Sequence, residues 1–127
     1  MEGKVFLRSI LAATVSVATY QSAAASELFG QWRRGDGHVQ IRIASCGAAL
    51  CATNTWVRDD NGREKVGEKL IFKNLTQDRE GWVGSAYDPQ RNLTVSARLK
   101  LVGNRLVSSG CVLGGVICRS VDWTRVE

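Results

Sequence analysis

The chain has 127 residues, a length that fits a single domain. Seventeen lysines and arginines against twelve aspartates and glutamates give a net charge of +5 at pH 7. The basic residues are scattered and form no stripe interleaved with aromatic side chains, which excludes a nucleic-acid-binding surface of the usual kind.

The first 25 residues contain the three parts of a secretory signal peptide. Lys4 and Arg8 make the start positive, residues 9–20 carry no charge, and a run of three alanines ends at Ala25. The apolar stretch of about 12 residues is too short to cross the ~30 Å hydrocarbon core of a bilayer as a helix. We therefore expect cleavage after Ala25, a mature domain of residues 26–127 without a transmembrane segment, and a location in the periplasm or outside the cell.

After residue 25, apolar and polar residues alternate with a period of two, which is typical of strands with one buried face. The longest such runs are residues 39–43 and 93–101, and shorter ones are 70–72, 82–86 and 121–125.

Turn-forming sequences separate these runs at short intervals. They are Gly35-Asp36-Gly37, the Asp-Asp-Asn-Gly stretch at 59–62, Asp88-Pro89 and Gly103-Asn104. About eight strands in roughly 100 residues is the pattern of a meandering antiparallel sheet that closes into a barrel. The sequence therefore predicts an all-β fold, a small antiparallel barrel of about eight strands.

The four cysteines, Cys46, Cys51, Cys111 and Cys118, all lie in the predicted mature domain. An even number of closely spaced cysteines in an exported chain predicts disulfide bonds. We favour the local pairs, Cys46–Cys51 and Cys111–Cys118, because each brackets glycine that can turn the chain; the pairing of one early with one late cysteine stays open. The spacing does not favour zinc, since the lone His38 has no second histidine near it.

Two features at opposite ends of the mature domain belong together. Gly30 and Trp32 form a G-x-W motif on the first strand, and Arg125 lies on the last strand. They resemble the closure of lipocalin-like (calycin) barrels, in which a tryptophan fills the barrel floor and an arginine packs over its ring. The resemblance implies that Arg125 contacts Trp32, an interaction worth about 0.5–2 kcal/mol.

A longer match covers nearly the whole mature domain. Its motifs are, in order, Gly30–Trp32, Val39–Cys51, a strand with Trp56, Tyr87–Pro89, Gly110–Gly114 and Trp123–Val126. In this order they resemble a family of small exported bacterial proteins known as a domain of unknown function, DUF2147. The resemblance implies a lipocalin-like barrel in the cell envelope and brings no established activity with it.

The patterns that indicate catalysis are missing. No nucleophile elbow accompanies His38. Asp59 and Asp60 are adjacent in a turn, so their side chains diverge and cannot act on one substrate as paired carboxylates. The rest of the calcium-ligand pattern is also missing around them. Gly114 and Gly115 precede neither a lysine nor a helix, so they do not indicate a phosphate loop. We therefore expect a protein that is not an enzyme and that uses no cofactor or metal.

The aromatic residues allow a sharper hypothesis. Trp32, Phe72, Trp82 and Trp123 either fill the core or line a cavity, because an eight-stranded barrel is packed solid or holds one small ligand. We favour a binding module for a small apolar or amphipathic molecule of the envelope, with these four residues as its candidate lining.

The alternative hypothesis is an envelope protein-interaction module, or an inhibitor of a secreted protease or lysozyme. Residues 26–32 are similar to the mature start of bacterial metalloprotease inhibitors, in which the N-terminal segment enters the protease cleft. The similarity covers these residues alone.

Overall fold

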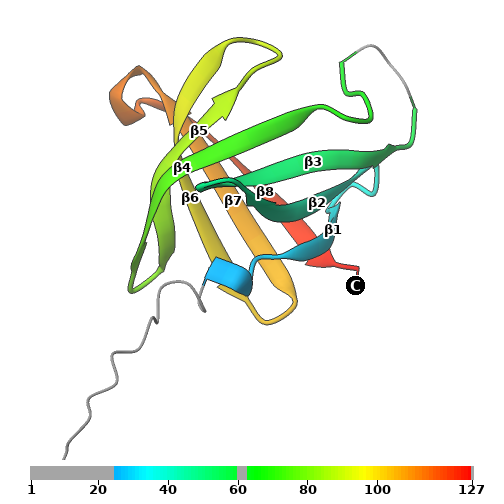
Figure 1. Ribbon diagram of the computed structural model, residues 1–127, viewed down its shortest axis with the longest axis horizontal. Coiled ribbons are helices and arrows are strands. Elements are labelled where there is room, and N and C mark those ends of the chain that lie inside the picture. Colours follow the sequence, from blue (N-terminus) through cyan, green and yellow to red (C-terminus); the bar gives the residue numbers. More distant parts are fainter. Residues whose placement is uncertain (1–24, 60–62, 127) are drawn as a thin grey trace, which may run out of the picture.

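The computed structural model describes residues 25–59 and 63–126, which form eight strands and one short 3-10 turn, η1 (Leu113–Gly115). The strands are β1 (Gly30–Arg34), β2 (Val39–Cys46), β3 (Ala49–Val57), β4 (Lys69–Asp78), β5 (Gly81–Asp88), β6 (Leu93–Val102), β7 (Arg105–Val112) and β8 (Ile117–Arg125). Each strand pairs antiparallel with its sequence neighbours, and β8 pairs with β1, so the sheet closes into a barrel (Figure 1). The predicted fold class is confirmed.

The apolar residues of the alternating sequence face the inside of the barrel, and the polar residues between them face the outside. On β2, Val39, Ile41 and Ile43 are buried, whereas Arg42 between them is exposed. Since side chains of a strand point alternately to its two faces, the apolar residues of all strands meet in one core.

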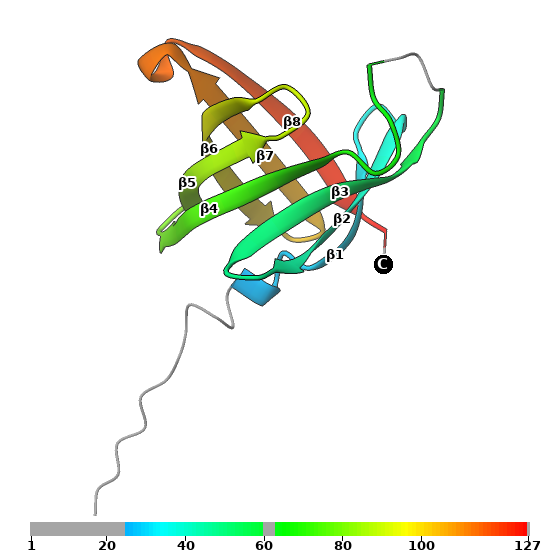
Figure 2. The same ribbon diagram turned by 45° about the horizontal axis from the view of Figure 1, so that its top comes forward.

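The meander gives the barrel two different ends. The connections β1–β2, β3–β4, β5–β6 and β7–β8 lie at one end, which we call the open end. The N-terminal residues 25–29 and the connections β2–β3, β4–β5 and β6–β7 lie at the other, the closed end (Figures 1 and 2).

The closed end is filled by the N-terminal segment. Trp32 and Leu28 are both fully buried, and the Trp32 Nε1–H donates to the Leu28 carbonyl at 2.9 Å. The guanidinium carbon of Arg125 lies 4.2 Å from the centre of the Trp32 ring. The same guanidinium donates to the carbonyls of Phe29 at 3.0 Å and Glu27 at 2.8 Å, so it ties the segment to β8.

Two disulfides staple hairpins, one at each end. Cys46–Cys51 joins β2 to β3 at the closed end, and Cys111–Cys118 joins the facing residues of β7 and β8 at the open end. These are the two local pairs that the sequence favours, and the cross-pairing is not formed.

Part of the sequence prediction falls outside the described residues. The signal peptide lies outside the described residues except for Ala25, so it stays a prediction. Residues 60–62 of the predicted turn at 59–62 also lie outside them. The chain between β3 and β4 runs from residue 58 to 68, which is longer than a tight hairpin turn. No helix in the described part of the chain is long and apolar enough to span a membrane.

Candidate functional site: a cavity at the open end

The barrel is hollow toward its open end. An inner cavity of about 230 Å³ rests on buried aliphatic side chains and is bordered by Phe72 and Trp123. The aliphatic residues are Ile41, Ile43, Ala52, Leu99 and Leu106. Charged and polar residues at the open end surround its entrance, namely Glu64, Glu68, Lys69, Asp88, Gln90 and Arg91.

A second hollow, the apolar groove, adjoins the inner cavity on the side of β6, β7 and β8. It has a volume of about 570 Å³, and its lining includes Val95, Val112, Ile117 and Val121. The groove and the inner cavity share four lining residues, which are Leu70, Phe72, Ser108 and Trp123. The two hollows therefore meet at the Phe72 and Trp123 rings.

Trp123 is held in place at this junction by a neighbour. Its indole Nε1–H donates to the Ser108 hydroxyl at 2.9 Å, and both residues line the two hollows. Because the polar atom of the ring has its partner on β7, the apolar face of the indole is free to contact a ligand.

A third hollow, the polar mouth, lies between the β1–β2 turn, the start of β8 and the β3–β4 connection. It has a volume of about 840 Å³ and is lined by Arg34, Asp36, His38, Glu64, Arg91 and Arg119, among others. It shares Glu64 and Arg91 with the inner cavity, and Arg119 and Val121 with the apolar groove.

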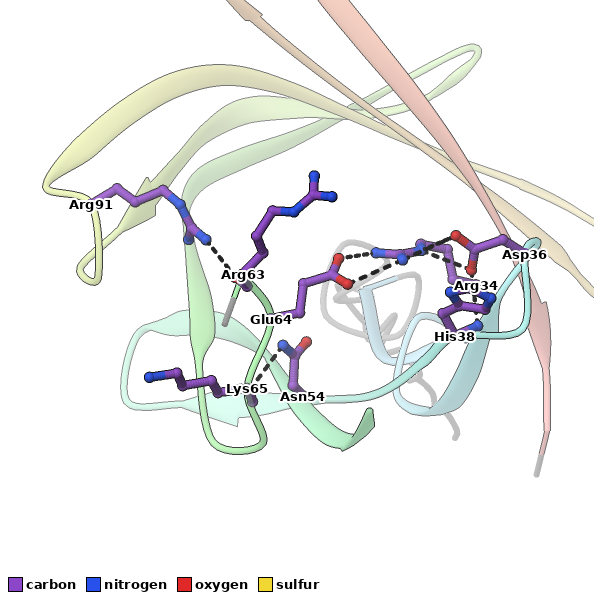
Figure 3. A network of polar contacts seen from close by, with 8 residues as sticks. All are labelled: Arg34, Asp36, His38, Asn54, Arg63, Glu64, Lys65 and Arg91. Carbon is purple, nitrogen blue, oxygen red and sulfur yellow. Dashed lines mark hydrogen bonds and ion pairs between the residues drawn. The ribbon is translucent and has the colours of Figure 1, made fainter. Parts of the chain in front are cut away.

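Arg34 is the centre of an ion-pair network in this mouth (Figure 3). Its Nε–H lies 3.0 Å from both carboxylate oxygens of Asp36, and its terminal nitrogens pair with both oxygens of Glu64. Hydrogen bonds from Arg34 hold the pKa of the Asp36 and Glu64 carboxyls below their ordinary values. Hydrogen bonding to Glu64 in turn raises the pKa of the Arg34 guanidinium.

Further contacts fix residues 63–68 of the β3–β4 connection beside the mouth. Arg91 donates to the Arg63 carbonyl at 3.0 Å, and the Asn54 side chain donates to the Lys65 carbonyl at 3.1 Å (Figure 3). Together with the Arg34–Glu64 pair, these bonds attach the segment to β1, β3 and the β5–β6 turn. The entrance of the cavity therefore has a defined, charged border.

The four aromatic residues proposed from the sequence separate into two pairs. Phe72 and Trp123 come together at the junction of the inner cavity and the apolar groove. Trp32 and Trp82 are buried in the packed core and line none of the three hollows in the described part of the chain.

Sequence reasoning missed the polar half of the site. Arg34 and Glu64 are separated by 30 residues, and nothing in the local sequence marks them as partners. Ser108 also gave no signal by itself. A signal was available only in the predicted strand order, because closure of the sheet places Arg34 at the end of β1 beside Trp123 of β8.

The N-terminal segment bears on the inhibitor hypothesis. Leu28 is buried, and the carbonyls of Glu27 and Phe29 accept hydrogen bonds from Arg125. From Glu27 onward the segment is therefore packed on the barrel and does not extend toward a protease cleft.

The described residues contain no cluster of three or more His, Cys, Asp or Glu side chains that could hold a metal ion. His38 is exposed in the β1–β2 turn, where its backbone N–H donates to Asp36 at 2.9 Å.

The fold and the hollow end define a small, closed, calycin-like β-barrel. The chain belongs to the family described as "Uncharacterized protein conserved in bacteria (DUF2147)", whose model matches residues 30–125. The family predicted from the spaced motifs is thus confirmed. Comparison with curated proteins and with solved structures finds no match.

Proposed function

We propose that this protein is an exported, non-enzymatic binding protein whose barrel holds a small amphipathic molecule of the cell envelope. The observation that carries the proposal is the junction of an apolar interior, at Phe72 and Trp123, with a charged border, at Arg34 and Glu64. The apolar part of the ligand would lie in the inner cavity and the apolar groove. Its polar end would remain at the mouth.

The dimensions support a small ligand. Pockets for drug-sized molecules commonly measure about 300–1,000 Å³. The inner cavity, at about 230 Å³, is below that range, whereas the apolar groove, at about 570 Å³, falls within it. A single flexible chain that occupies both fits this shape better than a rigid ring system.

The disulfides support an exported location. Stable disulfides form in oxidising compartments such as the bacterial periplasm, and the described part of the chain contains two of them. An amphipathic molecule of the envelope is then a ligand that the protein would meet there.

The test is a titration of mature protein with dodecanoate below its critical micelle concentration, followed by tryptophan emission. A Trp56→Phe background removes the exposed tryptophan on the outside of the barrel, so that the signal reports the interior. We expect a saturable shift of the emission, because the ligand would cover Trp123.

The matched variants are Ala52→Leu, which fills the inner cavity, and Ala44→Leu, which adds the same atoms to the partly exposed Ala44 outside the three hollows. Ala52→Leu should weaken binding by about tenfold or more, and Ala44→Leu should leave it unchanged. Leu70→Trp, at the junction of the two hollows, serves as the second filling variant if Ala52→Leu does not fold. Absence of any emission change at saturating dodecanoate, or equal binding by the filling variants, would refute the proposal.

A further inference from the structure

The turn between β7 and β8 is an exposed apolar projection. Residues 111–118, which we call the apolar lip, have the sequence Cys-Val-Leu-Gly-Gly-Val-Ile-Cys and contain no charged side chain. Leu113 is 71% exposed, Val116 79% and Ile117 56%. The turn extends beyond the neighbouring strands at one corner of the open end (Figures 1 and 2). A folded protein rarely leaves adjacent large aliphatic side chains this exposed unless they contact something.

The lip is preformed. The Cys111–Cys118 disulfide joins its base, where the two Cα atoms are 4.1 Å apart. Its tip turns sharply through Leu113, Gly114 and Gly115, all with positive φ. Because the tip is already ordered, docking it on a surface costs little conformational entropy.

The lip is also continuous with the interior of the barrel. Val112, Ile117 and Cys118 line the apolar groove together with Phe72 and Trp123. A surface that covers the lip therefore lies directly at the entrance of the groove.

A basic side chain follows the lip immediately. Arg119 is exposed and lines both the apolar groove and the polar mouth. Among the described residues none forms an ion pair with it, whereas Arg34 is paired with Asp36 and Glu64. Asp122, three residues further along β8, and Arg91, which pairs with Asp88, also line the polar mouth.

We propose that the apolar lip docks the barrel on an anionic phospholipid bilayer. Leu113, Val116 and Ile117 enter the interfacial layer, and Arg119 contacts lipid phosphate. An amphiphile then passes from the leaflet into the apolar groove without crossing water. This last step rests on the proposed function, whereas the docking does not.

The chemistry of the lip favours a bilayer over a protein partner. A stable protein interface needs about 800 Å² on each side and is enriched in aromatic and arginine anchors. Three aliphatic side chains at one hairpin tip are too few for that area. Insertion of such a tip between lipid headgroups requires no complementary surface, and a neighbouring cation strengthens it on anionic lipid.

The experiment is co-sedimentation of mature, oxidised protein with vesicles of phosphatidylcholine alone and of phosphatidylcholine mixed with phosphatidylglycerol. The lip variant is Leu113→Ser with Val116→Ser. The control variant, Val83→Ser with Val102→Ser, removes two exposed apolar side chains elsewhere on the barrel. Arg119→Glu tests the contribution of charge.

We expect the wild type and the control variant to bind the mixed vesicles. The lip variant should lose about tenfold or more in partitioning, and Arg119→Glu should lose the preference for phosphatidylglycerol. Wild type that stays in solution with both vesicles, or a lip variant that binds as well as the wild type, overturns the proposal. So does a dimer of the wild type, by light scattering, that the lip variant abolishes, because a second copy would then cover the lip.

Dodecanoate titration of the lip variant separates the two proposals. Leu113 and Val116 line none of the three hollows, so this variant should bind dodecanoate in solution as the wild type does. Vesicle docking without dodecanoate binding overturns the proposed function alone, and dodecanoate binding without docking overturns the membrane contact alone.

Discussion

Arg34 shows how one side chain can define the border of a candidate binding site. It lies at the end of β1, where its planar guanidinium reaches Asp36 two residues later and Glu64 on the β3–β4 connection. A guanidinium can satisfy two carboxylates at once because its donors form a fixed fork. The ion pairs of Arg34 thus fix Asp36 and Glu64, which lie in connections outside the strands.

The Arg34–Glu64 pair should make stability depend on pH in acid. A carboxyl group whose folded pKa is lowered contributes stability that is full above its unfolded pKa and is lost as the pH falls through its folded pKa. For Glu64 the ordinary value is 4.5, and Arg34 lowers it. The contribution should therefore be complete above pH 4.5 and disappear progressively below it.

The measurement is a double-mutant cycle with Arg34→Gln and Glu64→Gln, using urea unfolding across a pH series. At neutral pH we expect a coupling energy of about 1 kcal/mol, the upper end for partly exposed pairs with good geometry. It should approach zero in strong acid. The pKa of Asp36, which shares Arg34, is also lowered, so Asp36 contributes to the change below its ordinary value of 3.8. A coupling energy that is the same in strong acid and at neutral pH would contradict this assignment.

Among the elements, β4 carries an irregularity that β5 accommodates. The β4–β5 register shifts between Lys73 and Thr76, and Asn74 has a φ of 56°. Gly84 on β5 faces this bulge. A Cβ atom at Gly84 would lie 2.7 Å from the Lys73 carbonyl oxygen and 2.9 Å from that of Asn74. The bulge and the glycine therefore depend on each other.

Gly84→Ala should lower the free energy of unfolding by about 2 kcal/mol, because the methyl group forces two paired strands apart. Urea denaturation measures the loss. Gly35→Ala is the matched control, since a Cβ there meets nothing closer than 3.5 Å and the residue has no positive φ. That variant should remain within about 0.5 kcal/mol of the wild type. Equal stability of the two variants would show that β4 moves away from Gly84 without cost.

The two ends of the barrel differ in structure, since one is filled and the other is hollow. At the closed end Leu28, Trp32 and Arg125 fill and seal the barrel. The open end is divided in turn, with the ion pairs of Arg34 on the β1–β4 side and the apolar lip on the β7–β8 side. Under the proposed function, an amphipathic ligand would enter this end with its chain toward Trp123.

At this scale the signal peptide is the prediction to test. Full-length protein produced in a bacterium with a periplasm should be recovered from that compartment with an intact mass that begins at Ser26. Because the peptidase inspects the first and third residues before the cut, Ala25→Arg should block cleavage and Ala24→Arg should not. The mass should also show four oxidised cysteines, as the two disulfides require. Cytoplasmic protein that keeps Met1 would exclude the exported location.

The sequence by itself determined the class of fold and favoured the disulfide pairs that form. Alternation along residues 39–43 and 93–101 is enough to place strands, since period two has one structural meaning. The local disulfides were the favoured alternative, and the calycin resemblance implied the Trp32–Arg125 contact. Each depends either on residues close in the chain or on first and last strands that must meet when a sheet closes.

Only the tertiary structure decided which residues form the candidate site. Trp32, Phe72, Trp82 and Trp123 all face inward, and alternation cannot tell which of them reach a hollow. That depends on the height of each residue along the barrel, which the register and the β4 bulge set. The Arg34–Glu64 pair and the separation of the rim into charged and apolar sides arise from connections that meet at one end of the barrel. Such contacts between residues far apart in the chain leave no local pattern to read.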